Sequence, residues 1–190
     1  MKIIGIDYSL TSPAITLYNG NDSWDYNNGS CTHFCLVRNE RQRQKWAEIR
    51  SVKTEIYPVW DNDLQRYHGL ANWVINSCIT AMDPVRPKAY IEDYAFAATG
   101  RVFHIAENMA ILKDTLNKWG ISYEMIPPTV IKKYATGKGN ANKEKMYEAF
   151  SEESHRNLLQ EFNTKLNNPI TDIVDSYYIA KYGYAHGNNT

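Results

Sequence analysis

Three short apolar runs lie within the first 37 residues, and the connection between the first two limits how this chain can fold. We expect strands at Lys2–Tyr8, Ala14–Tyr18 and Cys31–Val37. The turn at Leu10–Pro13 is too short for a crossover connection, so the second strand must run antiparallel to the first. The stretch Asn19–Ser30 is rich in Asn, Gly and Asp, which predicts a loop before the third strand. The chain therefore starts as a three-stranded meander.

Helical and strand patterns alternate after this meander. Apolar spacing predicts two helices, Asp61–Met82 and Phe103–Trp119, which precede short strands at Lys88–Asp93 and Ile121–Ile126. The core stripes expected for these helices are Leu64, Tyr67, Leu70, Val74 and Ile75 in the first, and Ile105, Met109, Leu112 and Leu116 in the second. Further helices are expected at Pro127–Tyr134, Asn142–Phe150, Glu153–Leu166 and Ile170–Tyr184. The polar stretch Arg38–Tyr57 is predicted to be a loop or partial helix.

This order of elements predicts an α/β fold built on a mixed five-stranded sheet. Three antiparallel strands are followed by two parallel ones, and helices flank the sheet. The hydrophobic content of 43% and the charged content of 22% are typical of a globular protein. No repeat, linker or low-complexity tract divides the chain, so residues 1–190 are expected to form one domain.

Four carboxylates occupy the ends of the predicted elements. Asp7 and Glu92 end apolar strands, while Asp172 and Asp175 are three residues apart at the start of the last helix. Adjacent parallel strands end at the same edge of a sheet, where open α/β sheets keep their sites. Taken alone, Asp7 could simply start a turn, and the other aspartates could cap their helix. Together, the four predict a cluster of acidic side chains at one sheet edge.

Such a cluster suits a hard cation. Buried carboxylates are costly unless something positive accompanies them, and Mg²⁺ prefers oxygen ligands. Two Mg²⁺ ions about 3.5–4 Å apart can activate water and stabilise the leaving oxygen during phosphodiester hydrolysis. We therefore expect Mg²⁺ as the cofactor.

Local charge is informative because the net charge is zero, which by itself argues against a nucleic-acid partner. One basic stretch, from Thr129 to Met146, contains Lys132, Lys133, Lys138, Lys143 and Lys145. These lysines could supply positive charge near a phosphate. A second basic stretch, Arg38–Arg50, could equally be a solvated helix face.

The cysteines and the apolar segments indicate the compartment. Cys31, Cys35 and Cys78 form an odd, sparse set that fits free thiols in a reducing environment. Cys31, His33 and Cys35 share one face of a strand; a zinc site is conceivable, but small buried residues are the preferred interpretation. No leader or bilayer-length apolar run is present, so a cytoplasmic protein without membrane contact is expected.

The segments that carry these residues resemble those of a known family. They are Ile4–Ser9, Tyr90–Phe96, Val130–Lys143, which contains a Gly-x-Gly loop, and Asp172–Ala180. In this order and spacing, the chain resembles RuvC-type Holliday junction resolvases, the crossover junction endodeoxyribonucleases, and among them a bacteriophage-encoded relative. The resemblance implies a ribonuclease H-like fold and a homodimer that places paired, symmetric nicks across a four-way DNA junction, in the host cytoplasm if the protein is phage-encoded.

The resemblance also implies roles for individual residues. Asp7, Glu92, Asp172 and Asp175 match the family's metal-binding and catalytic carboxylates, which hold two Mg²⁺ ions for which Mn²⁺ substitutes. Lys132 and Lys143 match its lysines, with Lys143 assisting catalysis. The other residues expected to bind DNA are Lys133, Lys138, Arg101, Phe96 and Tyr94. Either Phe96 or Tyr94 would be the aromatic wedge at the junction centre, although Phe96 could instead be a core or interface residue.

Departures from the family pattern leave alternatives open. The segment Ala14–Met82 is longer than its counterpart in the bacterial enzymes, Tyr8 replaces a usual proline, and Tyr177 and Tyr178 replace small residues. The chain could therefore be a nuclease for branched DNA more broadly, or a catalytically idle junction-binding protein of the same fold.

Overall fold

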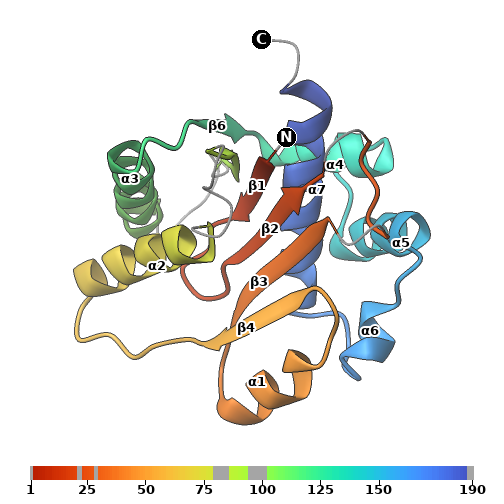
Figure 1. Ribbon diagram of the computed structural model, residues 1–190, viewed down its shortest axis with the longest axis horizontal. Helices are drawn as coiled ribbons and strands as arrows, with labels where there is room; N and C mark the ends of the chain where they lie inside the picture. Colours follow the sequence, from red (N-terminus) through yellow and green to blue (C-terminus); the bar gives the residue numbers. More distant parts are fainter. Residues whose placement is uncertain (1, 21–22, 28–29, 79–85, 94–101, 188–190) are drawn as a thin grey trace.

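A mixed six-stranded sheet lies at the centre of the fold, with helices on both of its faces (Figure 1). The computed structural model describes residues 2–20, 23–27, 30–78, 86–93 and 102–187. The strands are β1 (Lys2–Asp7), β2 (Ala14–Asn19), β3 (Cys31–Val37), β4 (Val52–Ile56), β5 (Lys88–Glu92) and β6 (Tyr123–Ile126). Their order across the sheet is β4-β3-β2-β1-β5-β6. As predicted, β1, β2 and β3 are antiparallel neighbours, and β5 and β6 run parallel to β1.

The prediction of five strands was wrong by one strand. The stretch assigned to loop or partial helix contains helix α1 (Glu40–Ala47) and then β4, which pairs in parallel with β3. Only Val52 of β4 is buried, so this edge strand lacks the apolar alternation by which a strand is recognised. Asn39 caps α1 by accepting a hydrogen bond from the backbone N–H of Gln42, and Trp46 packs its ring against Phe162.

The helices divide between the two faces of the sheet. Helices α2 (Asp63–Cys78) and α3 (Val102–Lys118) cover one face. Helices α4 (Pro128–Thr136), α5 (Lys143–Ser154), α6 (Leu158–Glu161) and α7 (Ile170–His186) belong to the other (Figure 1). Alternation along β1 sends Ile4 and Ile6 toward α2 and α3, and Ile3 toward α7. At Gly5, a Cβ would clash with the α7 backbone, so only glycine lets α7 lie this close to β1.

Some predicted helical details were wrong. Leu64, placed in the core stripe of α2, is 59% exposed, and Ile105 of α3 is only partly buried. The predicted helix Glu153–Leu166 is not continuous, because His155 adopts a left-handed conformation that ends α5. Only the short α6 forms within that stretch. Among the helices of the described residues, none combines the length and apolarity needed to cross a membrane.

Cys31, His33 and Cys35 are all buried on the face of β3 that α7 covers, as the preferred interpretation of their spacing predicted. His33 uses both ring nitrogens within the protein: Nδ1 is 2.8 Å from the Thr16 hydroxyl, and Nε2 is 3.0 Å from the Tyr26 hydroxyl. Burial, reinforced by the charge of Arg156, lowers the pKa of His33 to about 3, so the ring is neutral. With both nitrogens engaged, His33 is a structural residue rather than a zinc ligand.

Candidate active site

The sheet brings Asp7 and Glu92 together at one edge. Asp7 is the last residue of β1 and Glu92 the last of β5, and these parallel neighbours are in register at Ile6 and Ile91. Because side chains alternate along a strand, Asp7 shares the face of Ile3 and Glu92 shares that of Tyr90, the face that α7 covers. The same edge also receives the first turns of α7, which carry the other two carboxylates.

Burial raises the pKa of all four carboxylates, and repulsion from neighbouring carboxylates raises it further for Asp7, Glu92 and Asp175. Burial raises the pKa of Asp7 well above its usual range, and Asp172, Asp175 and Glu92 raise it further. Burial followed by repulsion from Asp175 raises the pKa of Glu92 to about 7. Burial and repulsion from Asp172 raise the pKa of Asp175 to about 6. The predicted cluster therefore exists as a set of side chains close enough to repel one another.

The cluster is sheltered but not sealed. Asp172 is 6% exposed, whereas Asp7, Glu92 and Asp175 each keep a partly exposed edge. In the part of the chain that the structure describes, no three His, Cys, Asp or Glu side chains already converge within metal-ligand distance. Like charges favour rotamers that separate their oxygens, so the four would have to turn inward to share a cation. Their all-oxygen donor set and excess negative charge fit Mg²⁺ chemically.

Ser12 is a site residue that sequence reasoning missed. Its hydroxyl donates a short hydrogen bond to the Asp172 carboxylate. Together with the charge of Lys143, this bond opposes the rise that burial imposes on the pKa of Asp172. The N-cap residue of α7 is Pro169, and no side chain caps this helix. Helix capping therefore does not explain why an aspartate occupies position 172. The only sequence signal was the presence of three small hydroxyl residues, Ser9, Thr11 and Ser12, within five residues of Asp7.

Two of the predicted lysines border the cluster. Lys143, the first residue of α5, places its Nζ 3.4 Å from the hydroxyl of Thr171, the neighbour of Asp172. Its charge lowers the pKa of Asp7 and Asp175, while that of Lys132 on α4 lowers the pKa of Glu92 and Asp175. The structure thus brings both lysines, as well as the carboxylates, to one edge of the sheet.

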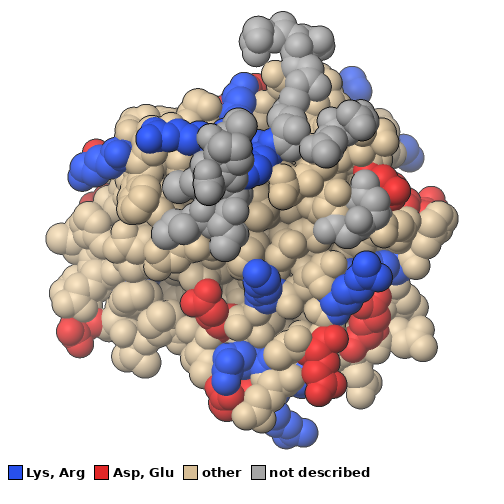
Figure 2. Space-filling model, in the orientation of Figure 1, with Lys and Arg blue, Asp and Glu red and all other residues tan. Residues whose placement is uncertain are grey.

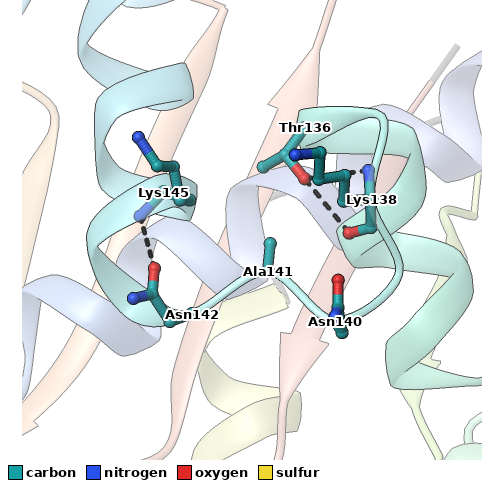
Figure 3. A pocket seen from close by; sticks show the side chains of 6 residues that line it. All are labelled: Thr136, Lys138, Asn140, Ala141, Asn142 and Lys145. Carbon is teal, nitrogen blue, oxygen red and sulfur yellow. Dashed lines mark hydrogen bonds between the residues drawn. The ribbon is translucent and has the colours of Figure 1, made fainter.

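Other predicted DNA-binding residues lie outside this centre. Lys133 is exposed beside a surface hollow that Tyr134 and Tyr182 also line. Lys138, also exposed, borders a pocket of about 450 Å³ between α4 and α5, shown in Figure 3, across from Lys145. Within this pocket the hydroxyl of Thr136 donates to the backbone carbonyl of Lys138. Tyr94, Phe96 and Arg101 lie outside the described residues, so their assigned roles stay predictions.

The second basic stretch is not a uniformly positive surface. Over α1, Figure 2 shows Lys and Arg side chains next to Asp and Glu side chains. On α1 itself, the Nη2 atom of Arg43 lies 2.6 Å from the Oε1 atom of Glu40 and forms an ion pair with it. Arg38 and Arg50, at the two ends of the stretch, have no side-chain partner among the described residues. Any DNA contact from this stretch must therefore come from individual side chains.

Comparisons with known proteins show which solved structures have a similar fold. No protein-family model and no curated protein sequence matches the chain. Among solved structures, RuvC of Thermus thermophilus in complex with a Holliday junction substrate matches with a TM-score of 0.64 at 11% identity, covering 99% of this chain and 96% of that one. A fowlpox virus resolvase, in complex with substrate Holliday junction DNA, matches with a TM-score of 0.51 at 12% identity over 100% of both chains. The yeast mitochondrial Holliday junction resolvase gives a TM-score of 0.51 at 12% identity, covering 94% of this chain and 75% of the yeast chain. At these identities the likeness concerns architecture: the chain has the ribonuclease H-like fold of the RuvC-type resolvases.

Proposed function

We propose that this protein is a metal-dependent endonuclease that resolves four-way DNA junctions. The observation that carries the proposal is the cluster of Asp7, Glu92, Asp172 and Asp175, gathered at one sheet edge with raised pKa values and flanked by two lysines. Burying so much like charge is costly, and a bound cation offsets that cost. The proposal gains support from the fold, which this chain shares with junction resolvases.

The four carboxylates would hold two Mg²⁺ ions, for which Mn²⁺ would substitute. When bound, such ions activate a water molecule and stabilise the leaving 3′ oxygen. Ser12 holds the Asp172 carboxylate in place by donating to it. Lys143 and Lys132 keep positive charge beside the carboxylates, where they can contact the phosphate under attack.

The branched substrate and the dimer belong to the same proposal. Thermus thermophilus RuvC and the fowlpox resolvase were both solved with Holliday junction DNA, and their architecture is the one described above. Paired, symmetric nicks need two active centres related by two-fold symmetry, so the working form would be a homodimer. The two rival functions are a nuclease for branched DNA in general and an idle junction-binding protein. An idle protein would gain nothing from four mutually repelling carboxylates.

The test is to compare labelled four-way junction, fork, flap and linear duplex as substrates of the purified protein in MgCl₂. We expect symmetric nicks in the four-way junction and little cutting of duplex. Equal cutting of fork, flap and junction would favour the broader branched-DNA nuclease. Binding without any cutting, in Mg²⁺ or Mn²⁺, would favour the idle binder and overturn the proposal.

The lysine beside the centre allows a second test. Lys143→Ala should lower the single-turnover cleavage rate by about a hundredfold or more and weaken junction binding much less, because the lysine acts on charge that develops at the reacting phosphate. Lys145→Ala, two residues further along α5 with its ammonium paired to Glu148, is the matched control and should cleave normally. An equal loss of binding and cleavage would make Lys143 a simple phosphate contact.

A further inference from the structure

A groove of about 660 Å³ opens at the same sheet edge as the carboxylates. Its base is formed by the end of β3, at Leu36 and Val37. One wall comes from α1 through Gln42 and Trp46, and the opposite wall comes from the loop that leads into α7. Because β3 runs antiparallel to β2 and β2 antiparallel to β1, the end of β3 lies at the same edge as Asp7. The groove therefore extends sideways from the catalytic cluster along the edge of the sheet.

Two lining residues connect this groove to the cluster. Ser12 lines it and donates to the Asp172 carboxylate. Asn168 also lines it, and its Oδ1 accepts a 2.9 Å hydrogen bond from Thr171, the residue beside which Lys143 lies. A molecule in the groove would thus touch the residues that hold part of the active centre. This continuity is what a substrate strand needs when it leads away from the reacting phosphate.

The groove's side chains favour a phosphodiester backbone. Arg38 lines it, is exposed, and has no side-chain partner among the described residues, whereas the nearby Arg43 is bound to Glu40. Gln42 turns its Oε1 to the backbone N–H of Arg38 at 3.0 Å, and no described residue accepts from its amide nitrogen. Trp46, although it borders the groove, is only 4% exposed and offers no face on which a base could stack. A guanidinium with amide and hydroxyl donors suits phosphate oxygens, and the buried Trp46 leaves no aromatic face in this groove for a base.

We propose that this groove, between α1 and the loop before α7, holds the DNA strand that flanks the scissile phosphate, with Arg38 as its phosphate ligand. The inference rests on the proposed nuclease function. It gives a role to the segment that contains α1, which was predicted only as a loop or partial helix, and β4, which was not predicted. In this proposal the segment extends the surface that contacts the backbone of the strand.

Binding is the direct test, measured in the Asp7→Asn background so that the DNA stays uncut. Arg38→Ala should weaken binding of a labelled four-way junction by about tenfold, and the slope of log K against log salt should fall by about 0.9, the value for one lost phosphate contact. Arg50→Ala is the matched control. Arg50 is also exposed and has no side-chain partner among the described residues, but it precedes β4 and so lies at the end of that strand away from the groove. It should leave both quantities unchanged.

Chemical cross-linking locates the strand independently. All three native cysteines are buried, so Gln42→Cys introduces a single accessible thiol at the groove. Junction strands carrying a thiol tether at successive nucleotides should form a disulfide with Gln42→Cys only within a few nucleotides of the cut site. Arg50→Cys should give no such preference.

The outcomes separate the two proposals. If the parent protein cuts the junction while Arg38→Ala behaves like Arg50→Ala and cross-linking shows no position dependence, the groove does not bind the strand and only this inference fails. If the parent protein neither binds nor cuts branched DNA, both the nuclease and the groove assignment fall. Weaker binding with an unchanged salt slope would also overturn the assignment of Arg38 as a phosphate ligand.

Discussion

Two groups of buried polar side chains lie between the sheet and α7, and they differ in how fully they are satisfied. In the first, Thr16 bridges His33 and Ser176 at 2.8 and 2.9 Å, and Tyr26 engages the second nitrogen of His33. Every member is neutral or paired, and burial holds the pKa of His33 low enough to keep its ring uncharged. In the second group, the carboxylate cluster, four acids face two lysines and one serine.

The two groups are direct neighbours, since Ser176 of the first follows Asp175 of the second. The first group is almost fully buried, and three of the four carboxylates keep a partly exposed edge, so deeper burial does not explain why the second group is the unsatisfied one. A fully hydrogen-bonded network makes the fold more rigid. A cluster of unneutralised like charges lowers the stability of the folded protein, and the binding of a cation or substrate offsets that loss. Residues of the first group should therefore matter for folding, and residues of the second should matter for activity.

Replacing Asp7 with Asn is the strongest test of this contrast. Cleavage of a four-way junction should fall at least about a thousandfold, which corresponds to about 4 kcal/mol in the activation free energy. Junction binding should persist. The free energy of unfolding at pH 8 without metal should rise, because one of four repelling charges is removed. Single-turnover cleavage and urea denaturation measure the two effects. A variant that cuts normally would remove Asp7 from the catalytic group.

His33→Leu should have the opposite signature. The substitution leaves the hydroxyls of Thr16 and Tyr26 without their buried partner, which should cost about 1–3 kcal/mol of stability. Cleavage by the folded fraction should change little, because the ring nitrogens of His33 bond to Thr16 and Tyr26 rather than to a carboxylate. Urea denaturation, with cleavage assayed well below the unfolding midpoint, separates the two. A large loss of activity without loss of stability would show that the two groups are not functionally distinct.

Ser12 shares features with both groups, because it is neutral and yet hydrogen-bonds to a carboxylate of the charged cluster. Ser12→Ala removes the hydrogen bond to Asp172, and such supporting contacts typically contribute about 10–100-fold to metal affinity or activity. We expect the Mg²⁺ concentration needed for half-maximal cleavage to rise by about tenfold, with most of the maximal rate kept. Thr11→Ala, at the adjacent groove-lining position, is the comparison. An unchanged Mg²⁺ dependence would mean that Asp172 is held by other contacts.

The sequence predicted the charged group better than the satisfied one, for physical reasons. Asp7 and Glu92 end apolar strands, and parallel pairing alone brings such ends to one edge. Lys143 was identified through the family resemblance, and the fold then placed it beside Asp172. Ser12, in contrast, lies on a loop whose side-chain directions follow no period. Strand β4 was missed because only Val52 is buried and its pairing depends on β3 rather than on its own pattern.

The smallest expected effect, and the most direct measure of unneutralised charge, is the response of stability to pH. Glu92 and Asp175 have pKa values of about 7 and about 6 in the folded protein, against usual values of 4.5 and 3.8. At a pH between the usual and the raised pKa values, the folded state holds more protons than the unfolded state. The free energy of unfolding must therefore fall as the pH rises through this range. The acids titrate as a set, so the fall should be gradual.

Added Mg²⁺ should reverse this loss, because it binds the ionised carboxylates. Melting temperatures measured from pH 5 to pH 8 should therefore decline without metal, by about 2–4 °C for each kcal/mol lost. MgCl₂ should raise the melting temperature clearly at pH 8 and hardly at pH 5. In Asp7→Asn both the decline and the rescue should shrink, while His33→Leu should melt lower throughout and keep the same slope. The protein could instead be equally stable at pH 5 and pH 8, or be stabilised by Mg²⁺ to the same degree at both. Either result would mean that the charges of the carboxylates are already neutralised without metal. The distinction between the two buried groups would then disappear.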